Sequence, residues 1–267
     1  NDPLPPDCPP LGDAGTEAPA VSEEELAAAA ERGGSRGFLA GLPGIGRPNI
    51  LLVGSLLLRL PAREVPESDV GSGDMQGVVR ELREALESGK HPLGIAAPQL
   101  GRRVRIVAVG ETEKAIEKLT ARDRVAEEHR AFGPLVLLNP VVRRHARSPD
   151  AYFFERSTSV PGYEAVVGRA LEIDVEAVDE NGRPLSFTTR GWQARMIQHA
   201  VDVLDGVLYI DRMEGRSFRR DTIEDEMPEG VPFGLKALTP ERSQAASKPK
   251  RPRKPKRRTV IAPMAKR

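Results

Sequence analysis

The segment 171–189 constrains the fold more than any other part of the chain. Apolar residues alternate strictly with acidic ones in Leu171-Glu-Ile-Asp-Val-Glu-Ala177, which is the two-residue period of a strand with one buried face. Asp179-Glu-Asn-Gly182 follows as a turn, and 185–189 supplies a second extended run. A two-strand unit joined by such a turn is a β-hairpin. The chain must therefore contain an antiparallel sheet that packs on a core.

Two helices are expected beside this hairpin. Residues 74–88 carry apolar side chains at three- and four-residue spacing with charges between them, and the same spacing recurs from Trp192 to Val203, before Gly206. A third, short helix is expected at 22–32. Short apolar runs at 104–109 and 135–138 indicate further strands. The expected fold class is α+β, with mixed or antiparallel sheets around a central helix.

Composition indicates that part of the chain lies outside the folded core. Only 39% of the 267 residues are hydrophobic and 4% are aromatic, whereas Gly and Pro number 25 and 24. We expect a Pro/Gly/Ala-rich arm at 1–48, a folded domain at 49–235 and a basic tail at 236–267. Charged and polar residues interrupt the most apolar run, 50–60, so no membrane span is expected. The single Cys8 excludes a disulfide-stapled domain and a Cys-rich zinc site, and it fits a reducing or organellar compartment.

The tail has a charge opposite to that of the rest of the chain. After residue 235 there are twelve Lys and Arg residues and one acidic residue, which leaves 28 basic and 38 acidic residues before it. Such a tail has a polyanion as its natural partner, and no aromatic residue is interleaved for base stacking. A solvated tail or a localisation signal is the alternative. The candidate nucleic-acid-binding residues are Lys248, Lys250, Arg251, Arg253, Lys254, Lys256, Arg257 and Arg258.

The chain has few sequence motifs that are typical of enzyme active sites. The chain has four His and lacks intact HExxH, CxxC, phosphate-loop and Gly-x-Ser-x-Gly motifs. The best local candidate is Gly94-Ile-Ala-Ala-Pro-Gln-Leu-Gly101, where the amide of Gln99 could stabilise an oxyanion. A Gly/Pro turn that leads into a strand is the alternative interpretation of this segment.

Several segments together resemble one known family. Gly94-Ile-Ala-Ala-Pro-Gln-Leu-Gly101, Glu155-Arg-Ser-Thr-Ser159 and Gln198-His-Ala-Val-Asp-Val-Leu204 follow one another in the order and spacing of the three motifs of the peptide deformylases. These metalloenzymes remove formyl groups from the N-termini of nascent proteins. The resemblance runs from about residue 56 to 213 and implies the deformylase fold.

The resemblance also implies where a metal would be held, and most of those groups are replaced. The family's ligands are one Cys in the second motif and two His in the third, with a Glu as general base. The matching positions here are Ser157, His199, Val203 and Ala200. Catalytic zinc sites use about three protein ligands. We therefore expect no metal, no cofactor and no catalytic residue, and a vestigial pocket formed by Gln99, Ser157 and His199.

These observations lead to a hypothesis of a chain that is not an enzyme. It would be a structural component or assembly factor of an organellar ribosome in the mitochondrial matrix, in contact with ribosomal RNA through its tail and with ribosomal proteins. Two alternatives stay open. One is a peptide deformylase or amidohydrolase with an atypical metal site, and the other is a protein that binds formyl-methionyl peptides without cleaving them.

Overall fold

Two antiparallel sheets form the body of the protein. The computed structural model describes residues 50–88, 93–223 and 228–236. The first sheet has five strands, in the spatial order β1 (Ile95–Ala96), β2 (Ile106–Glu111), β3 (Phe132–Arg144), β6 (Glu172–Val178) and β7 (Pro184–Arg190). The second has four, in the order β8 (Arg219–Arg220), β5 (Val160–Ala170), β4 (Asp150–Ser157) and β9 (Gly234–Lys236).

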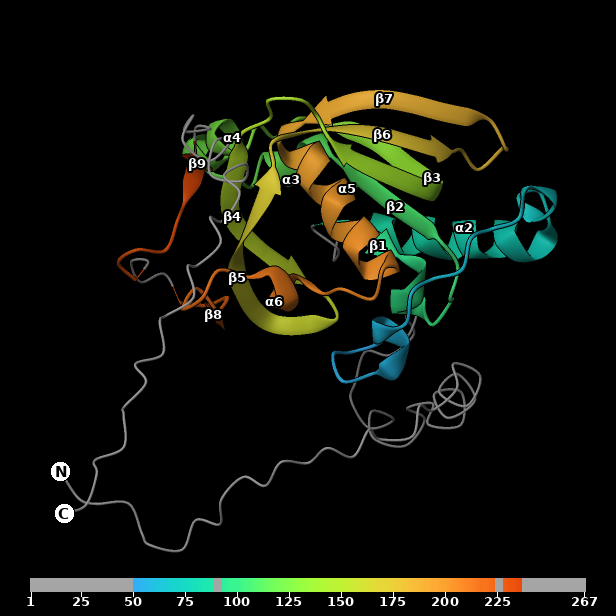
Figure 1. Cartoon of the computed structure of the whole chain (residues 1–267), viewed down its shortest axis with the longest axis horizontal. Coiled ribbons are helices and arrows are strands. Elements are labelled where there is room, and N and C mark those ends of the chain that lie inside the picture. The colour runs from blue at the N-terminus through green and yellow to red at the C-terminus, as the bar shows by residue number, and fades with distance from the viewer. Residues whose placement is uncertain (1–49, 89–92, 224–227, 237–267) are drawn as a thin grey trace, which may run out of the picture.

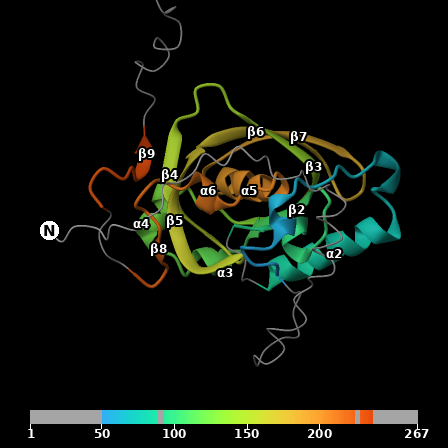
Figure 2. The same cartoon turned by 60° about the horizontal axis from the view of Figure 1, so that its bottom comes forward.

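Helix α5 (Gly191–Leu204) lies in the middle of the molecule. Figure 1 shows this orange helix between the strands of the five-stranded sheet and the pair β4 and β5, and Figure 2 shows the same enclosure from below. Ten of its residues are buried, among them Met196, Ile197 and Leu204. A helix that is buried on most of its faces is stabilised by tertiary packing on every side. Its central place brings its side chains against both sheets.

Helix α2 (Gly73–Glu87) forms a second, smaller core on the outer face of β1, β2 and β3. Its buried residues lie on one face and include Val78, Val79 and Leu82. The helix begins after Ser72, whose side chain accepts a hydrogen bond from Met75 N at 3.3 Å. The remaining helical elements are short: η1 (Leu56–Arg59), η2 (Glu67–Asp69), η3 (Ala97–Leu100), α3 (Glu113–Ile116), α4 (Ala121–Ala126) and α6 (Tyr209–Arg212).

The elements expected from periodicity are confirmed. The hairpin is β6 and β7, paired from Glu172 with Arg190 to Val178 with Pro184. The predicted helices are α2 and α5, the strand predicted at 135–138 lies in β3, and the strand predicted at 104–109 corresponds to β2, which begins two residues later, at Ile106. The α+β fold with antiparallel sheets around a central helix is confirmed as well.

Other expectations have a different outcome. The sequence patterns do not predict strands β4 and β5, although the pairing of these strands supplies one side of the helix's enclosure. The helix expected at 22–32 lies outside the described residues, as do nearly all of the basic tail and the N-terminal arm. The boundaries at 48 and 235 stay a prediction. Within the described ranges, no helix combines the length and apolar character needed to cross a bilayer.

Candidate functional site

The amide of Gln99 is fixed by the turn in which it lies. This turn is η3, which follows β1 and ends at Gly101 with a φ of 78°, and Gln99 within it is 2% exposed. Its Oε1 atom accepts a hydrogen bond from Ala96 N at 2.9 Å. Because Oε1 is held by the backbone, Nε2 is directed away from it, and this atom donates to Ser159 Oγ at 3.1 Å. The orientation of the amide is therefore set by hydrogen bonds within the protein itself.

Ser157 lies beside that amide at the end of β4. Its Oγ is 3.5 Å from Gln99 Nε2 and accepts a hydrogen bond from Ser159 N at 3.3 Å. Burial alternates along β4, so that Glu155 and Ser157 face the interior while Arg156 between them is exposed. The register with β5 shifts between Arg156 and Ser157, so it is the burial of both side chains, rather than regular alternation, that places them inward. The hydroxyl of Ser157 and the carboxylate of Glu155 therefore point to the same side of the sheet.

His199 reaches this side of the sheet from α5. The ring is 4% exposed, and its Nδ1 lies 2.9 Å from Oε2 of Glu155. A carboxylate can only accept, so this contact requires that Nδ1 carry the hydrogen. The structure gives the other ring nitrogen, Nε2, no hydrogen-bond partner among the described residues. Its lone pair is thus free to accept a proton.

Glu155 is the centre of a buried cluster of charges. Its two carboxylate oxygens accept from Arg169 at 2.8 and 2.9 Å, and Oε1 also accepts from Arg195 Nη1 at 2.8 Å. Asp202 of α5 pairs with Arg169 as well, and with the half-exposed Arg212 at 2.7 Å. The buried anions and cations thus balance, which is the condition under which buried charge is tolerated.

The same cluster fixes the ionisation of Glu155. Burial opposes the charged carboxylate, but Arg169 and the hydrogen bond from His199 outweigh it and hold the pKa of Glu155 well below its usual value. Burial works to lower the pKa of Arg169, but Glu155 and then Asp202 outweigh it, so the pKa is raised above its ordinary value. The carboxylate next to His199 is therefore permanently ionised near neutral pH.

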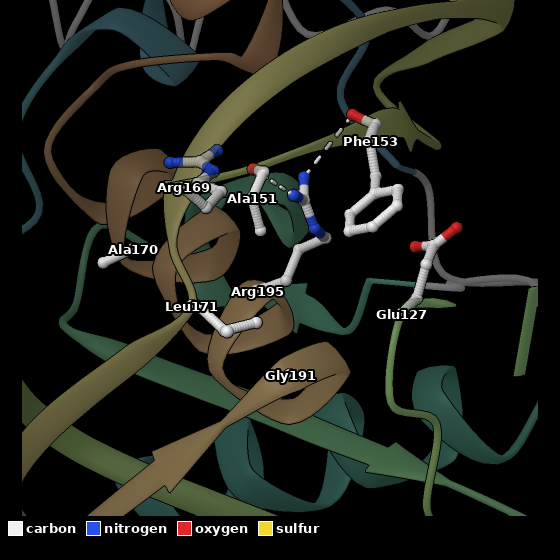
Figure 3. A pocket seen from close by; sticks show the side chains of 8 residues that line it. All are labelled: Glu127, Ala151, Phe153, Arg169, Ala170, Leu171, Gly191 and Arg195. Carbon is white, nitrogen blue, oxygen red and sulfur yellow. Dashed lines mark hydrogen bonds between the residues drawn. The ribbon is translucent and has the colours of Figure 1, made fainter. Parts of the chain in front are cut away.

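A small cavity lies next to the cluster, and Figure 3 shows the residues around it. Arg195 donates to Ala151 O at 2.7 Å and its guanidinium lies over the ring of Phe153, 5.2 Å from the ring centre, while Glu127 lines the same cavity. The Oε2 atom of Glu127 is buried without a hydrogen-bond partner, and burial raises the pKa of this carboxyl to about 7 in spite of Arg195 and His129. Burial lowers the pKa of Arg195 too, although Glu155 and Glu127 oppose this shift, so burial disfavours the charged form of both groups.

The structure brings the sequence-predicted residues Gln99, Ser157 and His199 to the same region, the first two in contact and the third through Glu155. That they form a functional pocket stays a prediction. Sequence reasoning missed the cluster of Glu155, Arg169 and Arg195. A signal was present, because Arg195 lies four residues before His199 on the buried face of α5, where a charge requires a partner.

Comparison with known proteins identifies the family. A sequence profile described as polypeptide deformylase matches residues 48–219. The chain belongs to the peptide deformylase family. The predicted resemblance is thereby confirmed.

The relatives of this deformylase-family chain include organellar proteins. It is 36% identical over 178 residues to "Peptide deformylase 1A, chloroplastic" of Solanum lycopersicum, which covers 67% of this chain and 63% of that protein. It is 31% identical over 170 residues to "Peptide deformylase, mitochondrial" of Homo sapiens, which covers 64% of this chain and 69% of that protein. The chain thus spans less than two thirds of the tomato protein. An organellar location fits these relatives.

Solved structures agree with the fold. A peptide deformylase from Synechococcus elongatus, determined in complex with actinonin, has a TM-score of 0.52 at 30% identity and covers 64% of this chain and 82% of its own. A class I type b peptide deformylase from Acinetobacter baumannii, determined with Met-Ala-Ser bound, has a TM-score of 0.54 at 24% identity, with 62% and 98% covered. The deformylase fold expected from the motifs is confirmed.

The hypothesis of a non-catalytic ribosomal component is wrong. The relatives are named as peptide deformylases, which are enzymes, and none of those compared carries the name of a ribosomal or RNA-binding protein. The interpretation relied on three replaced positions, and the wider similarity overrides it. The expected contacts of residues 248–258 with ribosomal RNA concern residues outside the described ranges, and they stay an untested prediction.

The metal that the family implies does not fit the residues of this deformylase-family chain. Within the described ranges, no group of three or more His, Cys, Asp or Glu side chains could hold an ion. Val203 is 1% exposed and places hydrocarbon one turn after His199 on the same face of α5, and the neighbouring Ala200, also 1% exposed, offers only a methyl group. The nearby acids, Glu155 and Asp202, are engaged by arginines. A site of about three protein ligands is therefore not available at these positions.

Proposed function

We propose that this chain removes the formyl group from the N-terminus of peptides, as an amidohydrolase whose site differs from that of its family. Family membership supports the reaction class. The observation that carries the proposal is the fixed amide of Gln99, whose Nε2 is directed toward Ser157 and Ser159 by the hydrogen bond from Ala96 N. Water and the formamide would yield formate and a free amino terminus.

The chain's own residues can serve two steps of this hydrolysis. Nε2 of Gln99 is a donor in a buried place, where it can stabilise the negative charge that develops on the formyl oxygen. Removal of one such donor in other enzymes costs about 10²–10³ in rate. His199, with Nδ1 held by the ionised Glu155, can accept and return a proton at Nε2. No step is assigned to a metal, because the donor set does not hold one.

Release of formate from a formyl-Met-Ala-Ser peptide tests the proposal. We expect turnover by the full chain, measured together with its metal content in the same preparation. Gln99→Glu keeps the acceptor and removes the amide donor, and it should lower the rate at least about 10²-fold. Gln76→Glu, the same exchange on α2, should not. Peptide binding without formate release would overturn the proposal in favour of a non-cleaving binder.

The mitochondrial matrix is our proposal for the compartment. It is supported by the organellar names of relatives and by the single cysteine. Fractionation of organelles with protease protection checks it, since a matrix protein resists protease until both membranes are opened. Recovery in the chloroplast or the cytosol would contradict it.

A further inference from the structure

The family's metal does not fit this chain, but the same place holds the parts of a different hydrolytic arrangement. The first is the pair of Glu155 and His199, joined at 2.9 Å between Oε2 and Nδ1. A buried carboxylate that accepts from Nδ1 fixes the tautomer of the ring and stabilises the imidazolium that forms when Nε2 takes up a proton. Arg169 and Arg195 keep that carboxylate ionised and in place.

The second part is the hydroxyl of Ser157. Its oxygen accepts from Ser159 N at 3.3 Å and lies 3.5 Å from Gln99 Nε2, so both contacts leave the hydroxyl hydrogen unused. The structure gives this hydrogen no acceptor among the described residues. The hydroxyl therefore has a hydrogen to give, whereas Nε2 of His199 has a lone pair to receive one.

The three elements that carry these residues, β4, α5 and η3, lie next to one another. Ser157 follows Glu155 on the inward face of β4, and Glu155 binds His199 from that face. Helix α5 packs against η3, which carries Gln99, and Gln99 contacts Ser157. Ser157, Glu155, His199 and Gln99 thus come from three adjacent elements: β4, α5 and η3.

We propose that Ser157 is the nucleophile of a metal-independent hydrolysis, with His199 as general base, Glu155 as its positioning residue and Gln99 as the oxyanion donor. The inference rests on the proposed deformylation for its substrate and on the contacts above for its chemistry. A hydrogen bond from Ser157 Oγ to His199 Nε2 is not among those of the described residues, and the proposal requires that it form when substrate binds. Catalytic hydrogen bonds often tighten only in the complex.

The steps balance without a co-reactant other than water. Oγ of Ser157 attacks the formyl carbon while its proton passes to Nε2 of His199, and Gln99 Nε2 donates to the oxyanion. The carbon–nitrogen bond then breaks, and the proton on Nε2 passes to the departing amine, which leaves a formyl ester on Ser157. Water, deprotonated by Nε2, attacks this ester, and its breakdown releases formate and returns the proton to Oγ.

A fluorophosphonate probe tests the nucleophile without the substrate, because it forms a covalent bond with an activated serine. We expect the full chain to gain one label, which peptide mass spectrometry assigns to Ser157, at a rate that a chelator leaves unchanged. Ser157→Ala should abolish the label. His199→Ala should slow it by about 10²–10⁴-fold, the usual contribution of a positioned base.

Ser217→Ala is the matched control. Ser217 is also buried, at 2% exposed, and its hydroxyl is satisfied by Val166 N and Glu214 O. This variant should label like the wild type. Circular dichroism and thermal melting should show that Ser157→Ala, which loses one oxygen atom, stays folded. Glu155 is left intact, since its removal would strand buried arginines.

The two proposals fail in different ways. Formate release that persists undiminished in Ser157→Ala, or that a chelator abolishes, would overturn the serine mechanism while deformylation stands. Labelling of Ser157 without formate release would overturn the deformylase function and leave the nucleophile supported. An unlabelled Ser157 in folded wild-type protein would overturn the serine mechanism whatever the turnover.

Discussion

The Oε2 atom of Glu155 lies 2.9 Å from the Nδ1 atom of His199, and this contact joins the four-stranded sheet to the central helix. Arg169 and Arg195 hold the same carboxylate from the other sides. One side chain thus orients a candidate catalytic ring and stabilises the junction of β4, β5 and α5. The charge of Glu155 therefore matters both for the stability of this junction and for the orientation of His199.

We predict that Glu155→Gln destabilises the fold by about 3–5 kcal/mol at pH 7, because it leaves Arg169 and Arg195 without their shared anion. The folded pKa of Glu155 is lowered, so its contribution is complete above its ordinary pKa and is lost as the pH falls through the lowered value. The wild type should lose stability below about pH 4.5. Urea unfolding of the variant and the wild type from pH 7 to 3 measures the loss of stability in Glu155→Gln and the pH dependence of the wild type's stability. The exposed control Glu64→Gln should change little; a similar loss there would contradict the assignment.

Glu127 should have the opposite effect on stability. Burial raises its pKa to about 7, so folding is penalised once the unfolded carboxyl ionises, and the penalty grows as the pH rises from about 4.5 to 7. We predict that Glu127→Gln stabilises the protein on the order of 3 kcal/mol at pH 8, and that the gain is absent at pH 4. Chemical unfolding at the two pH values tests this. An equal effect at both would show that ionisation of Glu127 is not its cause.

Gly94 should tolerate no side chain, unlike a second glycine of the same motif. A Cβ atom at Gly94 would lie 2.7 Å from Ala108 O and 2.7 Å from a methyl of Val109, at φ +79°. Gly101 has a similar φ of +78° and open space around it. Gly101→Ala should therefore cost about 1–2 kcal/mol of backbone strain. Gly94→Ala should cost about 1–3 kcal/mol more, because backbone must move. Equal melting temperatures for the two variants would contradict this reasoning.

The metal site of the family should be recoverable by exchange of the replaced positions. We predict that the combined variant Ser157→Cys, Ala200→Glu and Val203→His binds one zinc ion per chain, because His199 is already oriented by Glu155. Zinc should then raise the stability by about 2.7 kcal/mol at a hundredfold excess over Kd. Metal analysis and thermal melting measure this. Addition of His199→Ala to the combined variant should abolish both zinc binding and the gain in stability. Zinc bound by the wild-type chain would contradict our conclusion that its residues do not hold a metal.

Local patterns were sufficient to predict a large part of the fold. Helices α2 and α5 and the hairpin of β6 and β7 follow from side-chain periodicity, which a single element expresses in its own residues. The motifs likewise indicated Gln99, Ser157 and His199 as candidate site residues, and the resemblance they carry indicated the family and its fold. The inference that failed, from replaced ligands to a non-enzymatic ribosomal role, used the same motifs to decide what the whole protein does.

Only the tertiary structure decided how these residues are connected. The sequence shows Glu155, Arg169, Arg195 and His199 as separate polar side chains on three segments, and no local period relates them. The pairing of β4 with β5 brings Arg169 to Glu155, and the packing of α5 adds Arg195 and His199. Buried charges are tolerated only where they pair with opposite charges, and which charges can pair depends on how distant segments pack. The sequence determined helices α2 and α5, the hairpin of β6 and β7, and the family, whereas packing determined which carboxylate orients the histidine.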